Sequence, residues 1–379
     1  MRYLIIAGEA SGDLHGSNLI KGLRKADSGA EIWCRGGDLM EKAGAVLLAH
    51  YRATAFMGFW EVLVNIRAIR RSMAECRKMI SRINPDVLIL IDYPGFNLKM
   101  AAYAHGLGIP VFYYIAPKVW AWKESRIALL RKYVTRLYSI LPFEIEYFSR
   151  HEYPVHYFGN PLVDEIERHR ELLCNKGSVT GLLGLAGKPV IALLPGSRVQ
   201  EVKRILPGMV AITGYYPDYQ FVVAATPGIP EDLYHRIIGT REVKLIYNKT
   251  YEILAVSEAA LVKSGTSTLE AALIGAPQVV CYRAGHISYY LARLLVKVRF
   301  ISLVNLLMDK EVVKELIQGD LNERMIVKEL NSLIRGGWKR DIIRRHYGEI
   351  RQMMGGPGAS ERVANDMAAS LKSIMNEKN

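Results

Sequence analysis

Short apolar runs alternate with longer mixed segments along most of the chain, and glycine, proline or polar residues bound each run. Apolar runs of this length are typical of strands in a parallel sheet, because helices cover both faces of such a sheet. In the first half the pattern predicts strands at 3–7, 31–35, 87–92, 111–114, 135–140 and 155–158. In the second half it predicts strands at 190–194, 220–225, 243–246, 259–262 and 278–282.

The alternation of strand and helix predicts an α/β protein with two Rossmann-like, doubly wound parallel sheets and a cleft between them. A chain of 379 residues is long for one core and natural for two. We predict an N-terminal domain over 1–165 and a C-terminal domain over 188–354, joined through the stretch from Gly177 to Lys188. From Lys310 the pattern predicts helix, interrupted by Gly355-Gly-Pro-Gly358.

The stretch from Ala259 to Tyr282 indicates a site for a nucleoside diphosphate. An apolar strand is followed by Lys263-Ser-Gly-Thr-Ser-Thr268 and by a helix that carries Glu270 in its first turn. A glycine turn, hydroxyl caps and the free N–H groups of a helix N-terminus favour an anion, and Glu270 is placed to bind a ribose diol. An ordinary capped helix explains the motif equally well. The candidate ligands are Ser264, Gly265, Thr266, Ser267, Thr268 and Glu270.

A second strand-loop-helix unit favours the diphosphate interpretation. The apolar strand at 190–194 runs into Pro195-Gly-Ser-Arg198, which places a cation at the carboxyl end of the strand. Ligands of open α/β sheets bind at those ends, and the guanidinium fork of Arg198 suits phosphate oxygens. The alternative for Arg198 is a surface salt bridge. We therefore expect the two units to converge on one diphosphate.

Asp92 is the candidate catalytic residue. It ends the apolar strand at 87–92 and precedes Pro94, which sets the start of the next helix. A carboxylate at that position could accept a proton from an acceptor hydroxyl. The competing interpretation is a helix cap, and position alone favours catalysis.

A glycine-rich turn, Gly8-Glu-Ala-Ser-Gly-Asp13, follows the first strand. It matches neither the dinucleotide fingerprint nor a phosphate-binding loop with lysine. Glu9 and Asp13 would repel a pyrophosphate, so sugar hydroxyls suit this loop better; a helix capped by Ser11 is the equal alternative. His15 nearby is a candidate acid or base, although a lone histidine on a helix is more often structural.

The amino-acid composition indicates which classes of partner the chain binds. The formal charge of +13 indicates an anionic partner, and the spread of the basic residues favours lipid or a phosphorylated substrate over nucleic acid. No signal-peptide order and no apolar run of transmembrane length is seen, and the four cysteines lie far apart, so a cytoplasmic location is expected. The chain lacks paired carboxylates or a His/Asp/Glu cluster, so neither a metal nor another cofactor is expected.

The stretch from Ala55 to Arg71 has the pattern of an interfacial amphipathic helix. A core helix with a basic, solvated end is at least as common, but the positive total charge favours contact with an anionic membrane. The expected contact residues are Phe56, Phe59, Trp60, Leu63, Arg67, Arg70 and Arg71.

Eight motifs span the chain in this order: Gly8-Glu-Ala-Ser-Gly-Asp13, Gly58-Phe-Trp-Glu-Val-Leu63, Asp92-Tyr-Pro-Gly-Phe-Asn97, Val119-Trp-Ala-Trp122, Leu141-Pro-Phe-Glu144, Leu194-Pro-Gly-Ser-Arg198, Ser264-Gly-Thr-Ser-Thr-Leu-Glu270 and Val313-Lys-Glu-Leu-Ile-Gln318. Together they resemble the lipid-A-disaccharide synthase family. The resemblance implies a GT-B fold and a C-terminal helix, about 358–379, that packs on the first domain. It also implies a peripheral enzyme on the inner face of the cytoplasmic membrane.

The implied reaction transfers 2,3-diacylglucosamine from its UDP ester to 2,3-diacylglucosamine 1-phosphate with inversion. The implied product is a β-1′,6-linked disaccharide, and UDP is released. Asp92 would be the base, Arg198 and the helix start would stabilise UDP, and the residues expected around the sugars are Glu9, Ser11, Asp13, Asn305 and Gln318. A UDP-N-acetylglucosamine-processing relative such as an epimerase and a silent, membrane-bound sugar-nucleotide-binding subunit stay open as alternatives, as does a homodimer.

This chain departs from the commoner family pattern at three places. Gly159-Asn-Pro161 stands where Gly-His is usual, the residue before Asn305 is not proline, and Tyr114-Ile-Ala-Pro-Lys118 differs from the commoner Ser-Pro-Ser. The sequence therefore assigns no role to Asn160 or Lys118.

Overall fold

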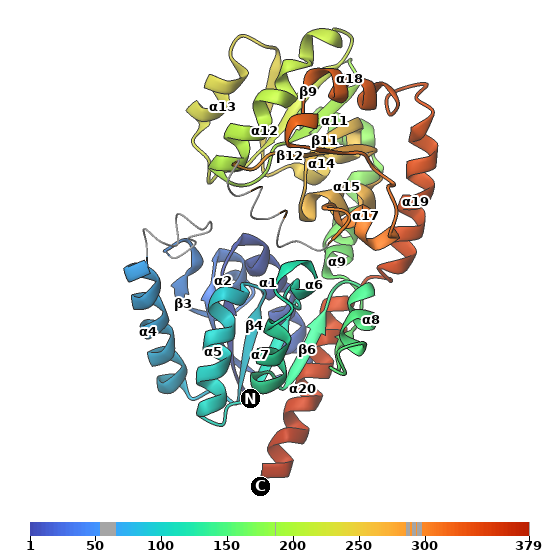
Figure 1. Ribbon diagram of the computed structural model, residues 1–379. Coiled ribbons are helices and arrows are strands. Elements are labelled where there is room, and N and C mark those ends of the chain that lie inside the picture. The colour runs from blue at the N-terminus through green and yellow to red at the C-terminus, as the bar shows by residue number, and fades with distance from the viewer. Residues whose placement is uncertain (54–65, 186, 286–288, 290–292, 294–297, 379) are drawn as a thin grey trace. The chain divides into compact units, whose positions relative to one another are not determined.

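The computed structural model in Figure 1 describes residues 1–53, 66–185, 187–285, 289, 293 and 298–378. The chain divides into two compact units: unit 1 consists of Met1–Asp164 and Gly356–Asn379, and unit 2 of Glu165–Gly355. Each unit is built on a parallel sheet with helices on both faces. The predicted pair of doubly wound α/β domains is confirmed.

Unit 1 has a seven-stranded sheet in the order β3-β2-β1-β4-β5-β6-β7. Its strands are β1 (Arg2–Ala7), β2 (Glu31–Gly36), β3 (Val46–His50), β4 (Val87–Ile91), β5 (Val111–Tyr114), β6 (Arg136–Ser139) and β7 (His156–Tyr157). Every residue of β4 and β5 is buried, as expected for strands with helices on both faces.

Two groups of helices cover the sheet of unit 1. Apolar side chains of α1 and α20 form the core on one face, and those of α4, α5 and α7 form the core on the other. The helices of this unit are α1 (Ala10–Ala26), α2 (Asp38–Lys42), α4 (Ile66–Ile83), α5 (Pro94–Gly106), α6 (Val119–Trp122), α7 (Arg126–Tyr133), α8 (Phe143–Ser149) and α20 (Ala359–Lys378), with a short 3₁₀ turn at Tyr51–Ala53.

The terminal helix α20 packs lengthwise on α1. Gly22 allows the close approach, because a Cβ there would lie 2.7 Å from the Cβ of Ala364. The start of α20 is held by Asp164, whose carboxylate accepts hydrogen bonds from the N–H groups of Gly358 (2.6 Å), Ala359 (3.1 Å) and Ser360 (2.8 Å). These are orphan donors of a helix start, so a residue distant in sequence caps the helix.

Unit 2 has a six-stranded sheet in the order β10-β9-β8-β11-β12-β13. Its strands are β8 (Val190–Leu194), β9 (Gln220–Ala225), β10 (Val243–Tyr247), β11 (Ser257–Lys263), β12 (Gln278–Tyr282) and β13 (Glu315–Ile317). Its helices are α9 (Pro161–Arg168), which begins in unit 1, α10 (Arg170–Cys174), α11 (Lys176–Leu182), α12 (Val199–Ala211), α13 (Glu231–Ile238), α14 (Thr250–Val256), α15 (Thr266–Ile274), α17 (Leu303–Met308), α18 (Glu323–Asn331) and α19 (Lys339–Met353), with 3₁₀ turns at Thr213–Tyr215 and Gln318–Asp320.

Three local expectations need correction. Strands β3 and β13 were not predicted, and β13 lies in a stretch for which the pattern predicted helix. The stretch from Gly177 to Lys188, expected as a passage between domains, lies within unit 2. There Val179 of α11 packs against Ile253 and Leu254 of α14 in the core.

The expected amphipathic stretch is described only in part. Phe56, Phe59, Trp60 and Leu63 lie outside the described residues, whereas Arg67, Arg70 and Arg71 are exposed on α4. Ser72, Cys76 and Ile80 form the buried stripe of the same helix. Within the described ranges, the helices are too short or too polar to span a bilayer.

The cap of α20 yields a stability prediction. Asp164→Ala leaves three N–H groups without their acceptor, so the free energy of unfolding should fall by about 1–3 kcal/mol in a denaturant titration followed by circular dichroism. The control is Glu361→Ala on the same helix, which removes an exposed ion pair with Lys25 and should change the free energy by about 0.5 kcal/mol or less. Equal effects of the two substitutions would show that the cap contributes nothing.

Candidate active site

The strand order of unit 1 reverses between β1 and β4, and ligands of open α/β sheets bind beside the carboxyl ends of the strands at such a point. Gly8 and Glu9 follow β1, and Asp92 and Tyr93 follow β4. The approach is close, because a Cβ on Gly8 would lie 2.4 Å from the ring of Tyr93. The topology therefore brings Glu9 and Asp92 to one point, as the sequence led us to expect for a site at strand ends.

Asp92 is held by its backbone. Its N–H donates to the carbonyl of Tyr114 (3.1 Å), and its carbonyl accepts from Tyr113 Oη (2.6 Å) and Asn97 Nδ2 (2.7 Å). Asp92 and Tyr93 both have left-handed backbones, with φ of 45° and 48°. Such strain in non-glycine residues persists only where the surroundings enforce it. Helix α5 begins at Pro94 with Tyr93 as its N-cap residue, so Asp92 does not occupy the cap position.

The electrostatic surroundings of Asp92 suit a base. Burial and the negative charge of Glu9 raise the pKa of its carboxyl to about 6, while Lys118 and Arg126 oppose the rise. A base works best when its pKa lies near the working pH. Lys118, to which the sequence assigned no role, is exposed and also lies near Glu144, a buried carboxyl after β6 whose pKa burial raises to about 7.

The other candidates of the first loop have different positions. Ser11 is exposed, and its hydroxyl donates to Glu9 Oε1 (2.9 Å). Asp13 is buried, and its carboxylate accepts from the N–H groups of Gly37, Leu39 and Met40 at the start of α2 (2.8–3.1 Å). Asp13 thus caps α2, and its expected contact with a sugar stays a prediction.

Two further residues of unit 1 that the sequence analysis discussed, His15 and Asn160, are buried in the fold. His15 is buried inside the domain, where burial lowers the pKa of its imidazole to about 4, so it stays neutral at ordinary pH. Asn160 is also buried, donates to the carbonyl of Ile140 (2.9 Å) and accepts from the N–H of Leu162 (2.9 Å).

The strand order of unit 2 reverses between β8 and β11, which are neighbours with Leu194 opposite Val262. Their carboxyl ends therefore lie side by side, and helices α12 and α15 both begin there. Arg198 is the N-cap residue of α12, and Gly265 is the N-cap residue of α15. The expected convergence of the two strand-loop-helix units is what the sheet topology produces.

The start of α15 differs in detail from the expectation. No side chain caps it at the N-cap position, which is glycine. Ser264 donates its N–H to the carbonyl of Cys281 and its hydroxyl to that of Ile301, and Thr268 donates both to Gly265. These two residues shape the turn, so Gly265, Thr266 and Ser267 are the better placed ligands.

Glu270 lies in the second turn of α15, not in the first. Tyr251 Oη donates to its carboxylate (3.3 Å), and burial raises the pKa of that carboxyl, while hydrogen bonds from Ser267 and Tyr251 oppose the rise. A ribose diol would have to join this existing set of contacts.

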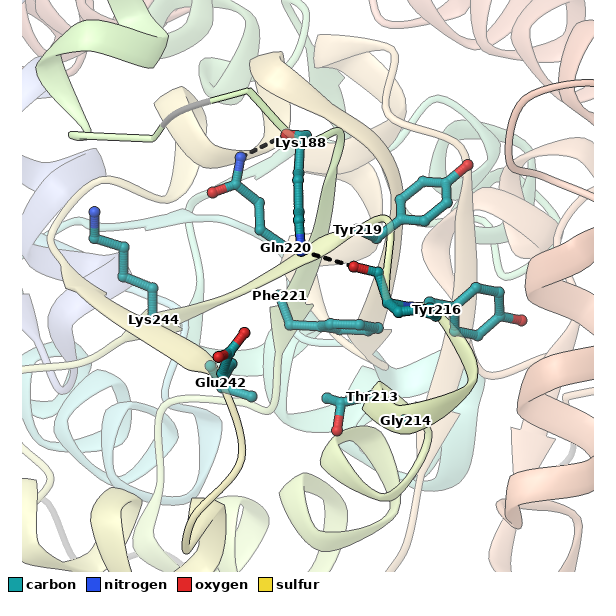
Figure 2. Close-up of a pocket in the computed structure, with 11 residues that line it drawn as sticks. Lys188, Thr213, Gly214, Tyr216, Tyr219, Gln220, Phe221, Glu242 and Lys244 are labelled. Atoms are coloured by element: carbon teal, nitrogen blue, oxygen red, sulfur yellow. Dashed lines mark hydrogen bonds between the residues drawn. The ribbon is translucent and has the colours of Figure 1, made fainter.

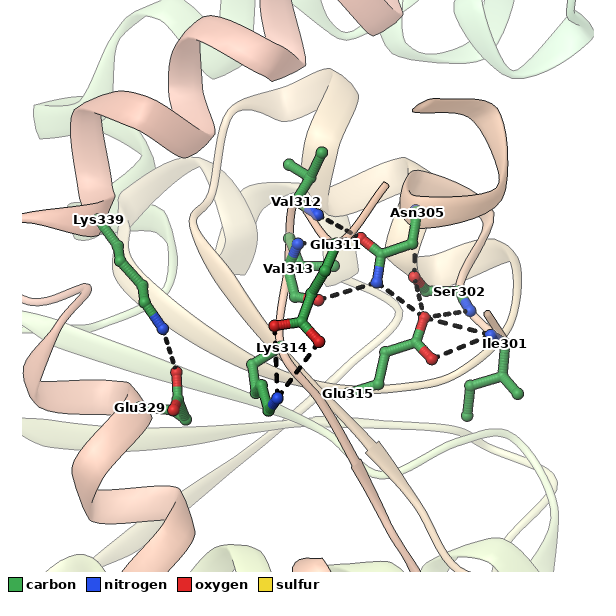
Figure 3. A network of polar contacts seen from close by, with 10 residues as sticks. All are labelled: Ile301, Ser302, Asn305, Glu311, Val312, Val313, Lys314, Glu315, Glu329 and Lys339. Carbon is green, nitrogen blue, oxygen red and sulfur yellow. Dashed lines mark hydrogen bonds and ion pairs between the residues drawn. The ribbon is translucent and has the colours of Figure 1, made fainter. Parts of the chain in front are cut away.

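Figure 3 shows a polar network around Glu315 and Asn305. It includes Ile301, whose carbonyl accepts from the Ser264 hydroxyl, so the network supports the turn at Ser264. Glu315 accepts from the N–H groups of Ile301 and Ser302, from the Ser302 hydroxyl and from Asn305 Nδ2. Asn305 Nδ2 also donates to the carbonyl of Val313, and its Oδ1 accepts from the N–H groups of Val312 and Val313. All four hydrogen-bonding positions of the Asn305 amide are occupied, so this residue supports the loop instead of a sugar.

Gln318 follows β13 and has a left-handed backbone with φ of 55°. Its side-chain amide accepts from the N–H of Ala284 (2.6 Å) and donates to the carbonyl of Ala284 (3.3 Å). It fixes the segment that leaves β12. Glu315 and Gln318 thus both position backbone around the site, and Glu315, like Glu144, lies inside a motif that the sequence analysis noted without assigning it a role.

A pocket of about 520 Å³ lies elsewhere in unit 2 (Figure 2). It is lined by residues at the amino ends of β8, β9 and β10, among them Lys188, Gln220 and Val243. Ligands of parallel sheets bind at the opposite ends of the strands, so this pocket is not the candidate site. Among the described residues, three or more His, Cys, Asp or Glu side chains do not gather as metal ligands would.

A family model and a known protein of similar sequence indicate one family of enzymes. A family model described as lipid-A-disaccharide synthetase matches residues 3–364. A lipid-A-disaccharide synthase of Syntrophus aciditrophicus (strain SB) is 37% identical over 369 residues, which is 95% of this chain and 95% of the relative.

Two solved structures share the fold at low identity. A UDP-GlcNAc 2-epimerase of Methanocaldococcus jannaschii, in complex with UDP-GlcNAc and UDP, has a TM-score of 0.66 and 14% identity, with coverage of 97% of this chain and 100% of that chain. The calicheamicin glycosyltransferase CalG4 has a TM-score of 0.60 and 15% identity, with coverage of 99% of each chain. Together, the family model, the relative and the GT-B architecture lead to one assignment: the chain belongs to the lipid-A-disaccharide synthase family of hexosyltransferases.

Proposed function

We propose that the chain transfers 2,3-diacylglucosamine from its UDP ester to 2,3-diacylglucosamine 1-phosphate, with formation of a β-1′,6-linked disaccharide and release of UDP. Membership of the family supports the reaction class. The observation that carries the proposal is Asp92, a carboxyl fixed at the switch point of unit 1 with its pKa raised to about 6. A silent binding protein would not need a carboxyl in this state.

The proposed chemistry is a direct displacement with inversion. Asp92 takes the proton of the acceptor 6-hydroxyl while that oxygen forms a bond to the anomeric carbon of the donor. The bond from the anomeric carbon to the phosphate oxygen breaks, and its electron pair leaves with UDP. Transfer to a positioned base contributes roughly 10²–10⁴-fold to the rate.

Unit 2 is the proposed donor side. Arg198 and the start of α15 at Gly265, Thr266 and Ser267 would stabilise the charge that grows on the leaving diphosphate. Glu270 is proposed as the ribose ligand, beside Tyr251. Glu9 is proposed near the acceptor sugar, where it also acts on the charge of Asp92.

Both proposed substrates carry acyl chains, so we propose that the enzyme works on the inner face of the cytoplasmic membrane. The exposed Arg67, Arg70 and Arg71 on α4 support contact with anionic headgroups.

The first experiment tests the reaction and its base. Purified protein with both acylated substrates should yield the disaccharide by mass spectrometry, and Asp92→Asn should lower turnover by roughly 10²–10⁴-fold because the amide cannot accept the proton. The affinity for UDP, measured by calorimetry, should stay within a few-fold. Absence of product from the wild-type protein with good substrates would remove the proposed activity, and turnover of Asp92→Asn near the wild-type rate would remove Asp92 as base.

The pH profile gives a second prediction. Because the base acts as a carboxylate, kcat/KM should rise with pH through about 6 and level off above it. Glu9→Gln removes a negative neighbour that raises the pKa of Asp92, so the acidic limb should move to lower pH. The control is Glu146→Gln, which changes an exposed carboxylate of the same unit. An acidic limb that stays in place in Glu9→Gln would contradict the electrostatic argument.

Membrane contact gives a third prediction. Reversal of Arg67, Arg70 and Arg71 to Glu should weaken binding to vesicles with anionic lipid by at least about tenfold in a sedimentation assay, and high salt should act likewise. The matched control reverses three exposed cations of unit 2, Arg324, Lys328 and Arg335, and should keep the wild-type affinity. If both variants bind the vesicles equally well, the arginines of α4 do not contact the membrane, and α4 is an ordinary core helix with a solvated end.

A further inference from the structure

A charged triad connects the two strand-loop-helix units of unit 2. Glu201, in the first turn of α12, has its Oε1 atom 2.8 Å from Lys263 Nζ and 3.7 Å from Arg198 Nη1. Its Oε2 atom accepts from the N–H of Ser197 (3.1 Å). One carboxylate therefore contacts the cations at the carboxyl ends of two neighbouring strands.

The backbone is shaped around this carboxylate. Gly196 has a left-handed backbone with φ of 112°, and a Cβ there would lie 2.3 Å from Glu201 Oε2. Only glycine satisfies both conditions, the backbone angle and the contact. Glu201 is thus a fitted part of the loop, and its side chain is 16% exposed.

The side chain of Lys263 points toward the start of α15. It is the last residue of β11, its side chain is 22% exposed, and its ammonium nitrogen lies 3.5 Å from where a Cβ on Gly265 would stand. The ammonium therefore lies over the N-cap residue of α15. An ammonium has three donors, and Glu201 takes one direction.

We propose that Lys263 is a further ligand of the donor diphosphate and that Glu201 is the positioning residue that holds its ammonium over the start of α15. The inference rests on the proposed function for the identity of the ligand. Two cations and two helix starts against one carboxylate leave the site net positive, which suits a diphosphate. A lysine without this tether would lose side-chain freedom on binding, at a cost in affinity.

The test uses the whole chain and two ligands, UDP and uridine. Lys263→Met keeps the length of the side chain without its charge, so calorimetry should show UDP binding weakened by about 10- to 100-fold, the range for a charge-assisted contact. Uridine binding should change by less than about twofold, since uridine carries no phosphate. Lys263→Arg should recover part of the loss.

The matched control is Lys314→Met. Lys314 pairs with Glu311 and precedes β13, at the amino end of the sheet, so UDP should bind this variant as it binds the wild type. Unchanged UDP affinity in Lys263→Met, or an equal loss of uridine affinity, would overturn the assignment of Lys263.

Glu201→Gln tests the positioning role. Loss of the tether should weaken UDP binding by about threefold or more, and Lys263→Met should then have a smaller effect in the Glu201→Gln background than in the wild type. If Glu201→Gln binds UDP more tightly than the wild type, the carboxylate competes with the diphosphate and the positioning role is excluded. These binding readouts need no turnover, so they stand or fail separately from disaccharide synthesis by the wild-type protein.

Discussion

A parallel sheet with helices on both faces can place polar chemistry only in the loops at its strand ends. Both units obey this constraint, since apolar side chains fill the space between strands and helices on each face. The strand order reverses at β1/β4 in unit 1 and at β8/β11 in unit 2, and ligands of open α/β sheets bind at such points. Asp92, Arg198 and Lys263 all lie at these two points. The positions of the reactive groups thus follow from the burial of the sheets.

Four carboxylates, one buried and three half-buried, differ in how many backbone N–H groups they accept. Asp13 and Asp164 each accept three, and Glu315 braces a loop through two N–H groups and two side chains. Such donors fix the position of the side chain. Asp92 has a single backbone donor to its carboxylate, from Tyr93, and a negative neighbour in Glu9. Three of these carboxylates therefore fix the backbone around them. The fourth, Asp92, has a raised pKa and is suited to act as a base.

Much of this arrangement could be predicted from sequence. Long apolar runs such as 87–91 and 190–194 identify central strands, and the residues that follow them, Asp92 and Arg198, are then placed by topology. Strand β3 was missed because all of its residues are at least partly exposed, and β13 because it has three residues at a sheet edge. The structural roles of Asp13 and Asn305 depend on partners that local patterns do not reveal. The Glu201–Lys263 pair likewise joins two loops that are distant in sequence, so only the adjacency of β8 and β11 brings it about.

The cap that Asp164 provides for α20 lies at the point where the chain passes between the two units. The chain leaves unit 1 after Asp164 and returns at Gly356, and the Asp164 side chain contacts the N–H groups of residues 358–360. Exit and re-entry are therefore adjacent in unit 1, which makes unit 2 an insertion within a continuous host domain. Residues 1–164 alone would expose the apolar surface of α1 that α20 covers. A minimal version of unit 1 would instead join 1–164 to 356–379 by a short linker. Unit 2 could then be replaced by another inserted domain without a change to the fold of unit 1.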